Sequence, residues 1–147
     1  MTLRRVLLAA AVLALSTAAR AADPGADFAD KAAKEKGAVK TASGLVYRSI
    51  KDGTGPQATP ASTVKVNYKG TFIDGKVFDA SDKHGGPATF PLNRVIRCWT
   101  EGVAMMKVGG KAQLVCPPSI AYGAAGAPGA IPPNSTLVFE VELLAVQ

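Results

Sequence analysis

The segment VKVNYKGTFIDGKVF, residues 64–78, carries the clearest secondary-structure signals in the chain. Its first half alternates apolar and polar side chains, and this period of two predicts a half-buried strand with Val64, Val66 and Tyr68 on the buried face. Asp74-Gly75 lies between two apolar pairs, which is a strong hairpin signal because both central positions of a two-residue turn favour positive φ. The segment therefore predicts two antiparallel strands joined at residues 74–75.

Further strands are predicted on either side of this hairpin. A short apolar run at residues 45–50 ends at the turn residues of 52–56, and residues 112–116 form another candidate strand. Near the C-terminus every second residue is large and apolar, at Leu137, Phe139, Val141 and Leu143. This alternation predicts a long final strand with one buried face.

One short helix is expected between the hairpin and the later strands. Apolar residues recur there at helical spacing, at Val95, Trp99, Val103 and Met106. Asn93 precedes this stripe and the glycines at 109–110 follow it, as helix start and stop signals do. The apolar face of a single helix must be buried against another element, and the predicted antiparallel strands offer the surface for it. The predicted fold class is therefore α+β, with an antiparallel sheet wrapped around the helix. The segment 121–135, rich in Gly, Pro and Ala, is expected to be a functional loop.

The composition indicates one folded domain and excludes several classes of protein. Of the 147 residues, 48% are hydrophobic and 19% are charged, which argues against disorder, collagen and coiled coil. The formal net charge is +6, but three arginines lie in the first 21 residues, leaving 14 basic against 11 acidic residues, or +3. This charge is too small to indicate nucleic-acid binding.

Residues 1–21 have the order of parts of a secretory signal peptide. Arg4-Arg5 forms the basic start, residues 6–15 form an apolar run, and small residues lead to Ala21. Cleavage is expected after Ala21, with Ala18 as the alternative. A membrane anchor is the competing interpretation, but the apolar run falls short of the roughly 20 residues that a spanning helix needs. We therefore expect a periplasmic or secreted protein with no membrane span in the mature chain.

Residues 22–39 are expected to form a short N-terminal arm ahead of a domain at residues 40–147. A helix capped by Asp27 could run to Lys36, with Gly37 as its stop signal. So short a helix is marginal on its own in water. Two interpretations stay open: a solvated arm, or a stub that docks on the domain or on a second copy.

The sequence offers few of the residue sets that catalysis uses. Its only histidine, His84, lies in a glycine-rich turn without a nucleophile motif around it. The spacing of His84 and the two cysteines is not that of a metal site, and no metal or other cofactor is expected. An even number of cysteines in an exported chain favours a disulfide between Cys98 and Cys116, with two buried thiols as the alternative. Asp79 and Asp82 could form an acid–base pair, but aspartates three apart after a strand are more typical of turn caps.

Three longer motifs point to a known family. They are VNYKGTFIDGKVFDAS (66–81), FPLNRVIRCWTEGVAMMKVGGKAQLVCPPSIAYG (90–123) and IPPNSTLVFEVELL (131–144). In order and spacing, over roughly residues 40–147, they resemble the FKBP-type peptidyl-prolyl cis-trans isomerases. The resemblance implies a curved five- to six-stranded antiparallel sheet wrapped around one short helix, with a pocket between them for a proline ring.

The resemblance also implies which residues form this pocket. Trp99 would be its floor, and the apolar walls would be Tyr68, Phe78, Val95, Ile96, Ile131 and Phe139. The Tyr122 hydroxyl and the backbone N–H of Ile96 would donate hydrogen bonds to substrate carbonyls, and Asp79 would lie at the pocket edge. Singly, such aromatic residues could be plain core, but together they are more aromatic than a core of this size needs.

Several positions depart from the family pattern. Many relatives carry larger residues at Ala88, Ala127 and Ala130, so a shallower rim and a weaker grip on substrate are expected. Arg97 and Cys98 stand where proline and glycine are common. The resemblance also implies an arginine that pairs with the pocket aspartate; no arginine here matches it, and Lys83 is the candidate in its place.

The implied activity is acceleration of X-Pro bond rotation during the folding of exported proteins, by a non-covalent apolar pocket. The implied partners are unfolded or proline-containing polypeptides, with a macrolide of the FK506 kind as a candidate inhibitor. One alternative is a non-catalytic periplasmic chaperone or peptide-binding module that uses the same groove, and another is an adaptor whose Gly-Pro loop docks a partner. Asp79 and Tyr122 favour catalysis, because a holdase needs apolar area but no particular carboxylate or hydroxyl.

Overall fold

In the computed structural model, residues 23–147 are described, and the predicted signal peptide at residues 1–21 lies outside them. The described chain forms two α-helices and seven strands: α1 (Pro24–Ala33), β1 (Ala38–Lys40), β2 (Val46–Lys51), β3 (Thr63–Phe72), β4 (Val77–Ala80), β5 (Ala88–Pro91), α2 (Arg97–Gly102), β6 (Lys111–Cys116) and β7 (Leu137–Val146). Short 3-10 turns connect them at Ser81–His84, Leu92–Arg94, Val103–Met105 and Pro118–Ile120. Among these residues, no helix has the length and apolar character that crossing a membrane requires.

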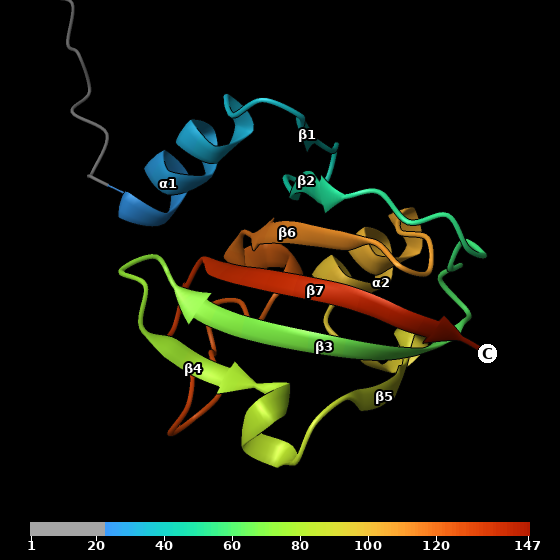
Figure 1. Cartoon of the computed structure of the whole chain (residues 1–147). Coiled ribbons are helices and arrows are strands. Elements are labelled where there is room, and N and C mark those ends of the chain that lie inside the picture. The colour runs from blue at the N-terminus through green and yellow to red at the C-terminus, as the bar shows by residue number, and fades with distance from the viewer. Residues whose placement is uncertain (1–22) are drawn as a thin grey trace, which may run out of the picture.

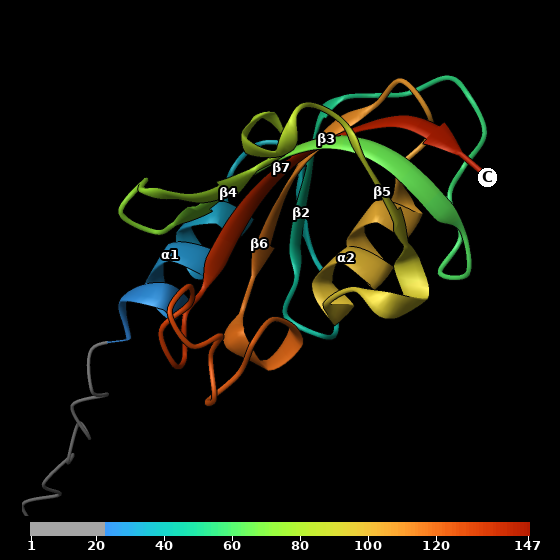
Figure 2. The same cartoon turned by 90° about the horizontal axis from the view of Figure 1, so that it is seen from below.

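All strands join one antiparallel sheet that curves around α2 (Figures 1 and 2). The strand order is β1-β2-β6-β7-β3-β4, and β5 pairs with the other half of β3. This confirms the predicted fold class. The sheet has seven strands where five or six were expected, because β1 comes from the end of the N-terminal segment and the short β5 has no clear sequence signal.

The concave face of the sheet and the α2 region enclose the main core. The predicted alternation holds along β3 and β7, where the side chains expected on the buried face are at most 9% exposed. From the α2 region, Trp99, Val103 and Met106 complete the core at 5% exposure or less. Burying an aliphatic side chain contributes roughly 1.5–3 kcal/mol, so this shared core fixes the helix against the sheet.

The hairpin between β3 and β4 is confirmed, but its predicted two-residue turn is wrong. Only Gly75 has a positive φ, at 89°, and Asp74 does not. The Gly75 N–H donates to the Phe72 carbonyl and the Phe72 N–H to the Lys76 carbonyl, each over 2.9 Å. The loop is therefore three residues long, 73–75, and ends in a glycine bulge. A separate register shift between Gly70 and Thr71 leaves Phe78 as an extra residue on β4.

The helix α2 is shorter than predicted, although its apolar stripe is buried. Val95 has an extended backbone, and Ile96 takes the N-cap position, so Asn93 is not the cap. The stripe continues past Gly102 as a 3-10 turn to Met105. The chain leaves helical geometry at residues 95–96 because these two residues form part of the cavity described below.

The N-terminal helix starts at a different cap from the predicted one. The Asp23 carboxylate accepts a hydrogen bond from the Ala26 N–H over 3.1 Å, with Pro24 at the first helical position. Asp27 instead lies in the first turn, where its charge suits the positive end of the helix. The helix ends at Ala33, before the predicted Lys36 and the positive-φ Gly37.

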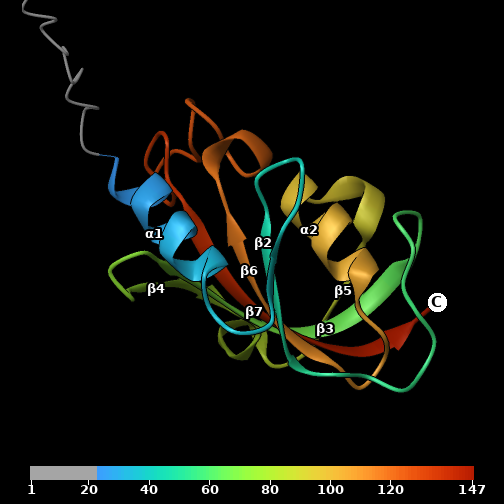
Figure 3. The ribbon, with the colours of Figure 1, turned by 90° about the horizontal axis from the view of Figure 1, so that it is seen from above.

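The helix α1 docks on the outer face of the sheet, opposite α2 (Figures 2 and 3). Ala29 and Ala32 are buried there in a small cluster with Val46, Val115 and Val138. Gly25, Ala29 and Ala32 are buried at helical spacing, so the buried face of the helix includes a first turn that a start at Asp27 would leave out. Of the two open interpretations of this segment, docking on the domain is the one the structure supports.

Candidate active site

The cavity between the concave face of the sheet and α2 is predominantly apolar and has a volume of about 580 Å³. Its lining comes from β3, β4, β5, α2 and β7, from the segment before α2 and from the loop after the 3-10 turn Pro118–Ile120. The lining residues are Tyr68, Phe78, Asp79, Phe90, Arg94, Val95, Ile96, Trp99, Tyr122 and Phe139. Eight of the nine residues predicted for a pocket therefore lie together. Ile131 does not line the cavity; its side chain is 6% exposed within the core, and its backbone pairs with Ala127.

The Trp99 ring forms the floor of the cavity, and three aromatic rings of the walls pack against it. The Trp99 ring is 5% exposed, and the rings of Tyr68, Phe90 and Phe139 stand edge-on to it at centroid distances of 5.3, 5.6 and 5.4 Å. Such edge-to-face contacts fix the rings in place. Within residues 23–147, the Trp99 Nε1 is buried without a hydrogen-bond acceptor, which costs about 1–3 kcal/mol. A phenylalanine at position 99 would avoid this cost, so stability alone does not explain the tryptophan.

The wall beside this floor depends on a glycine that the sequence analysis missed. A Cβ atom at Gly70 in β3 would lie 2.6 Å from the Phe78 ring and 2.9 Å from the Phe139 ring. Those two rings pack edge to face at 5.6 Å directly over the strand. Gly70 therefore leaves the space in which both aromatic walls approach the backbone.

Asp79 is the carboxylate at the cavity edge, and three hydrogen bonds hold it. The Tyr68 hydroxyl donates to its Oδ2 over 2.9 Å, while the Ala80 N–H donates to Oδ1 over 2.9 Å and the His84 Nε2 lies 2.8 Å from Oδ1. Desolvation would raise the pKa of Asp79, but the bonds from His84 and Tyr68 outweigh it and lower the pKa. Burial, together with the bond to Asp79, raises the pKa of Tyr68 to about 12. At neutral pH the edge thus carries an ionised carboxylate beside a neutral phenol.

The basic partner of Asp79 is His84, where the sequence analysis offered Lys83. The 3-10 turn Ser81–His84 carries the imidazole back to the strand that holds Asp79. Among the described residues, Lys83 forms no ion pair with Asp79, and no group of three metal-ligating side chains lies close enough to hold a metal. Phe90 and Arg94 are the other lining residues that sequence reasoning missed.

The mouth of the cavity offers two hydrogen-bond donors. Tyr122 is one of the exposed large side chains, at 41%, and lies on the loop after the 3-10 turn at residue 120. The backbone N–H of Ile96 has no acceptor among the residues that the structure describes. A ligand in this apolar cavity would therefore meet the Tyr122 phenol, the Ile96 amide and the Asp79 carboxylate. The Arg94 guanidinium and the Tyr68 phenol also belong to the lining.

A family model for FKBP-type peptidyl-prolyl cis-trans isomerases matches residues 55–144, which include every residue that lines this cavity. The chain belongs to that family. The FKBP-type isomerase FkpA of Escherichia coli K12 is 54% identical over 123 residues, which are 84% of this chain and 45% of the relative. The FKBP-type 22 kDa isomerase of the same organism is 49% identical over 83% of this chain and 59% of its own length. The chain spans about half the length of these curated relatives.

Solved structures agree with this assignment. The crystal structure of Escherichia coli FkpA matches with a TM-score of 0.81 and 54% identity, over 84% of this chain and 58% of that one. A peptidyl-prolyl cis-trans isomerase from Pseudomonas syringae matches with a TM-score of 0.79 and 38% identity, over 84% of this chain and 91% of that one. The curved sheet and α2 are thus the architecture of the FKBP family.

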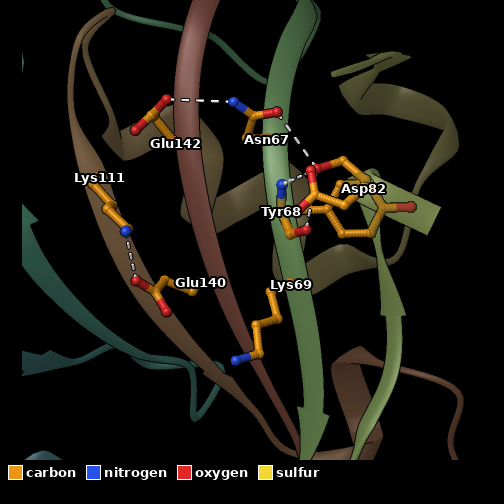
Figure 4. A pocket seen from close by; sticks show the side chains of 8 residues that line it. Asn67, Tyr68, Lys69, Asp82, Lys111, Glu140 and Glu142 are labelled. Atoms are coloured by element: carbon orange, nitrogen blue, oxygen red, sulfur yellow. Dashed lines mark hydrogen bonds and ion pairs between the residues drawn. The ribbon is translucent and has the colours of Figure 1, made fainter. Parts of the chain in front are cut away.

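A second cleft of this FKBP domain lies on the outer face of the sheet (Figure 4). It has a volume of about 290 Å³ and a mainly polar lining. Lys111 pairs with Glu140 over 2.8 Å, and the Asn67 amide donates a hydrogen bond to Glu142 over 3.4 Å. Among residues 23–147, the lining residues Lys69 and Asp82 form no ion pair.

None of the three alanines expected to shorten the rim lines the cavity. Ala88 packs against the main core from β5, Ala127 is half-buried, and Ala130 is exposed on the loop before β7. Cys98, beside Trp99 in α2, is paired with Cys116 at the end of β6, and their Cα atoms lie 5.8 Å apart. The floor residue is therefore next to a covalent link between helix and sheet.

Proposed function

We propose that this FKBP domain accelerates cis–trans isomerisation of peptide bonds that precede proline, and that it does so in the aromatic cavity. The observation that carries the proposal is the convergence of Trp99, Phe78, Phe139 and Asp79 on one predominantly apolar cavity of about 580 Å³. Membership of the FKBP family supports the same activity.

The reaction needs neither a covalent intermediate nor a proton transfer. Rotation about the bond must break amide resonance, a barrier of about 18–20 kcal/mol, and unaided prolyl isomerisation takes tens to hundreds of seconds. An apolar cavity disfavours the dipolar planar amide relative to the twisted, less polar form. Since only tighter binding of the twisted form accelerates the reaction, each tenfold gain requires about 1.4 kcal/mol of such preference.

The roles of the site residues follow from where each lies. Trp99 would lie under the proline ring, with Phe78, Phe139 and Tyr68 as walls, and Val95 and Ile96 would contact the residue before proline. The Tyr122 hydroxyl and the Ile96 amide would donate hydrogen bonds to carbonyls on either side of the bond. The Asp79 carboxylate would meet the carbonyl that rotates out of the amide plane. Ile131, buried beside the loop, would support the wall from behind.

We further propose that the substrates are unfolded or proline-containing polypeptides outside the cytoplasm. The signal-peptide pattern of residues 1–21 and the pairing of Cys98 with Cys116 support this location. The exported protein should then begin at Ala22, which mass spectrometry would identify. A mature species that still contains Arg4 and Arg5 would contradict export with cleavage.

The single tryptophan of the chain allows a direct test of the site. Because Trp99 forms the cavity floor, its fluorescence should change when a macrolide of the FK506 kind binds, and the same titration should inhibit isomerisation of an X-Pro peptide. Phe78→Ala should weaken both effects together. Inhibition without a change in Trp99 fluorescence would show that the activity lies elsewhere.

A further inference from the structure

The lining of the aromatic cavity contains two charged side chains, Asp79 and Arg94. The Asp79 carboxylate accepts a hydrogen bond from the Tyr68 hydroxyl over 2.9 Å, and His84 Nε2 lies 2.8 Å from it. Of the three arginines in the described part of the chain, Arg48 is the one whose guanidinium forms an ion pair and hydrogen bonds. Arg94 is therefore the charge of the lining that has no protein partner there, and this charge is positive.

The backbone places this arginine beside the proposed substrate contacts. Arg94 ends the 3-10 turn Leu92–Arg94, and the next two residues, Val95 and Ile96, line the cavity with it. Arg94 is also exposed, so its guanidinium can stay in solvent while its aliphatic stem borders the apolar lining. A substrate held by the Ile96 N–H would therefore lie beside a free cation at the cavity mouth.

The chemistry of the guanidinium determines what it can recognise in a polypeptide. It stays protonated at every physiological pH and carries five N–H donors in a planar fork. This fork matches the two oxygens of a carboxylate, so the groups it recognises in an unmodified polypeptide are the side chains of Asp and Glu. A substrate with apolar or amide side chains at this point gains no comparable contact.

We propose that Arg94 is a specificity-determining residue of the isomerase site, and that it favours peptides with an acidic side chain next to the X-Pro unit. This inference rests on the proposed function and names a substrate class for it. The methylene groups of a glutamate would lie on the apolar lining, and its carboxylate would meet the guanidinium at the exposed mouth. The expected preference is about two- to fivefold, the range of an exposed ion pair.

The contact with Arg94 should act on substrate binding and not on rotation of the bond. It holds a side chain that keeps its place while the amide twists, so it stabilises the planar and twisted forms equally. An interaction of this kind lowers KM and leaves kcat unchanged. An effect of Arg94 on kcat alone would therefore overturn the assigned role.

The test compares kcat/KM at pH 7 on two pairs of peptides, in a protease-free assay with the full mature chain. Each pair differs by Glu against Gln, at the residue before the proline in one pair and at the residue after it in the other. In at least one pair, Arg94→Gln should lower the Glu-to-Gln ratio of kcat/KM about two- to fivefold, and Arg94→Glu should lower it further. The ratio cancels any general loss of activity in a variant.

Arg97→Gln is the matched control. It removes the next arginine along the chain, which is also exposed and without an ion pair in residues 23–147 but does not line the cavity. This variant should keep the wild-type ratio. An equal fall in Arg94→Gln and Arg97→Gln would indicate attraction by the general charge of this surface and would overturn the proposal.

Ionic strength provides a second measurement. The Debye length falls from about 30 Å at 0.01 M salt to about 3 Å at 1 M, so added salt should lower the Glu-to-Gln ratio of wild type more than that of Arg94→Gln. A ratio that Arg94→Gln leaves unchanged in both pairs would overturn the proposal. A wild type that accelerates isomerisation of none of the four peptides would instead overturn the proposed function.

Discussion

The Tyr68 hydroxyl donates a 2.9 Å hydrogen bond to Asp79 Oδ2, across the paired strands β3 and β4. This bond joins an aromatic wall of the cavity to the carboxylate at its edge. It also ties together the pKa values of its two partners, because it raises that of Tyr68 and lowers that of Asp79. The Tyr68–Asp79 hydrogen bond should therefore affect both the stability of the fold and the isomerase activity proposed for the cavity.

Asp79 should stabilise the fold at neutral pH and lose this effect in acid. Its pKa is lower in the folded state than in the unfolded chain, where aspartate titrates near 3.9, so its contribution is present above about pH 4 and disappears as pH falls. Asp79→Asn should therefore be less stable than wild type at pH 7, by about 0.2–1 kcal/mol for so exposed a pair. Urea unfolding at pH 7 and near pH 3 measures the difference. A stability difference between wild type and Asp79→Asn that is larger near pH 3 than at pH 7 would contradict the lowered pKa of Asp79.

The link between Cys98 and Cys116 should contribute strongly to stability. Their Cα atoms lie 5.8 Å apart, within the range that a disulfide requires. Reduction of the bond, or replacement of both cysteines by alanine, should lower the free energy of unfolding by about 3 kcal/mol in the chain-entropy model. Alkylation of the unfolded, never-reduced protein provides the check. Two reactive thiols in protein isolated from the exported fraction would rule the bond out.

The docking of α1 predicts a difference between two alanines of one helix. Ala29→Glu would force a carboxylate against Val46, Val115 and Val138, so it should cost more than the about 1–3 kcal/mol of a buried uncharged polar group, or release the helix from the sheet. Ala26→Glu makes the same change on the exposed side and should be near neutral. Equal stability of the two variants, with equal helix content by circular dichroism, would show that α1 does not pack on the sheet.

Gly70 should be required for the shape of the cavity. In Gly70→Ala the new methyl group would displace the rings of Phe78 and Phe139, which it would approach to 2.6 and 2.9 Å. We expect a fall in isomerase activity of about tenfold, equivalent to about 1.4 kcal/mol of lost preference for the twisted amide. Gly75→Ala is a useful comparison, because no atom lies within 4 Å of its Cβ position, although its φ of 89° adds local strain. A folded Gly70→Ala protein with full activity would contradict this role.

The sequence predicted the parts of the fold that repeat a simple pattern. Alternation along β3 and β7 identified the buried side chains, because the two faces of these strands meet core and solvent. The pocket residues could be named because the family resemblance supplied an entire motif. Pattern and spacing alone would have left Trp99, Val95 and Phe139 as ordinary core.

The remaining features depend on contacts between segments. The Asp79–His84 pair forms only because a 3-10 turn follows β4, and a lone histidine beside two glycines gives no sign of it. Val95 and Ile96 leave the helical path to line the cavity, which a helical stripe cannot indicate. Asp23 and Asp27 are equally acceptable caps by sequence, and the burial of Gly25 in line with Ala29 and Ala32 favours the earlier start.

The most direct test of the account is a protease-coupled assay of an apolar X-Pro peptide with the mature chain and its Phe78→Ala variant. The wild-type protein should accelerate isomerisation above the uncatalysed rate, and the folded variant, with one wall removed, should lose about tenfold or more of that acceleration. Tyr122→Phe, which removes a single hydroxyl, should lose no more than about 1 kcal/mol, or about fivefold. A folded wild-type protein that leaves the peptide rate unchanged, yet suppresses aggregation of an unfolded client, would contradict catalysis and identify a chaperone.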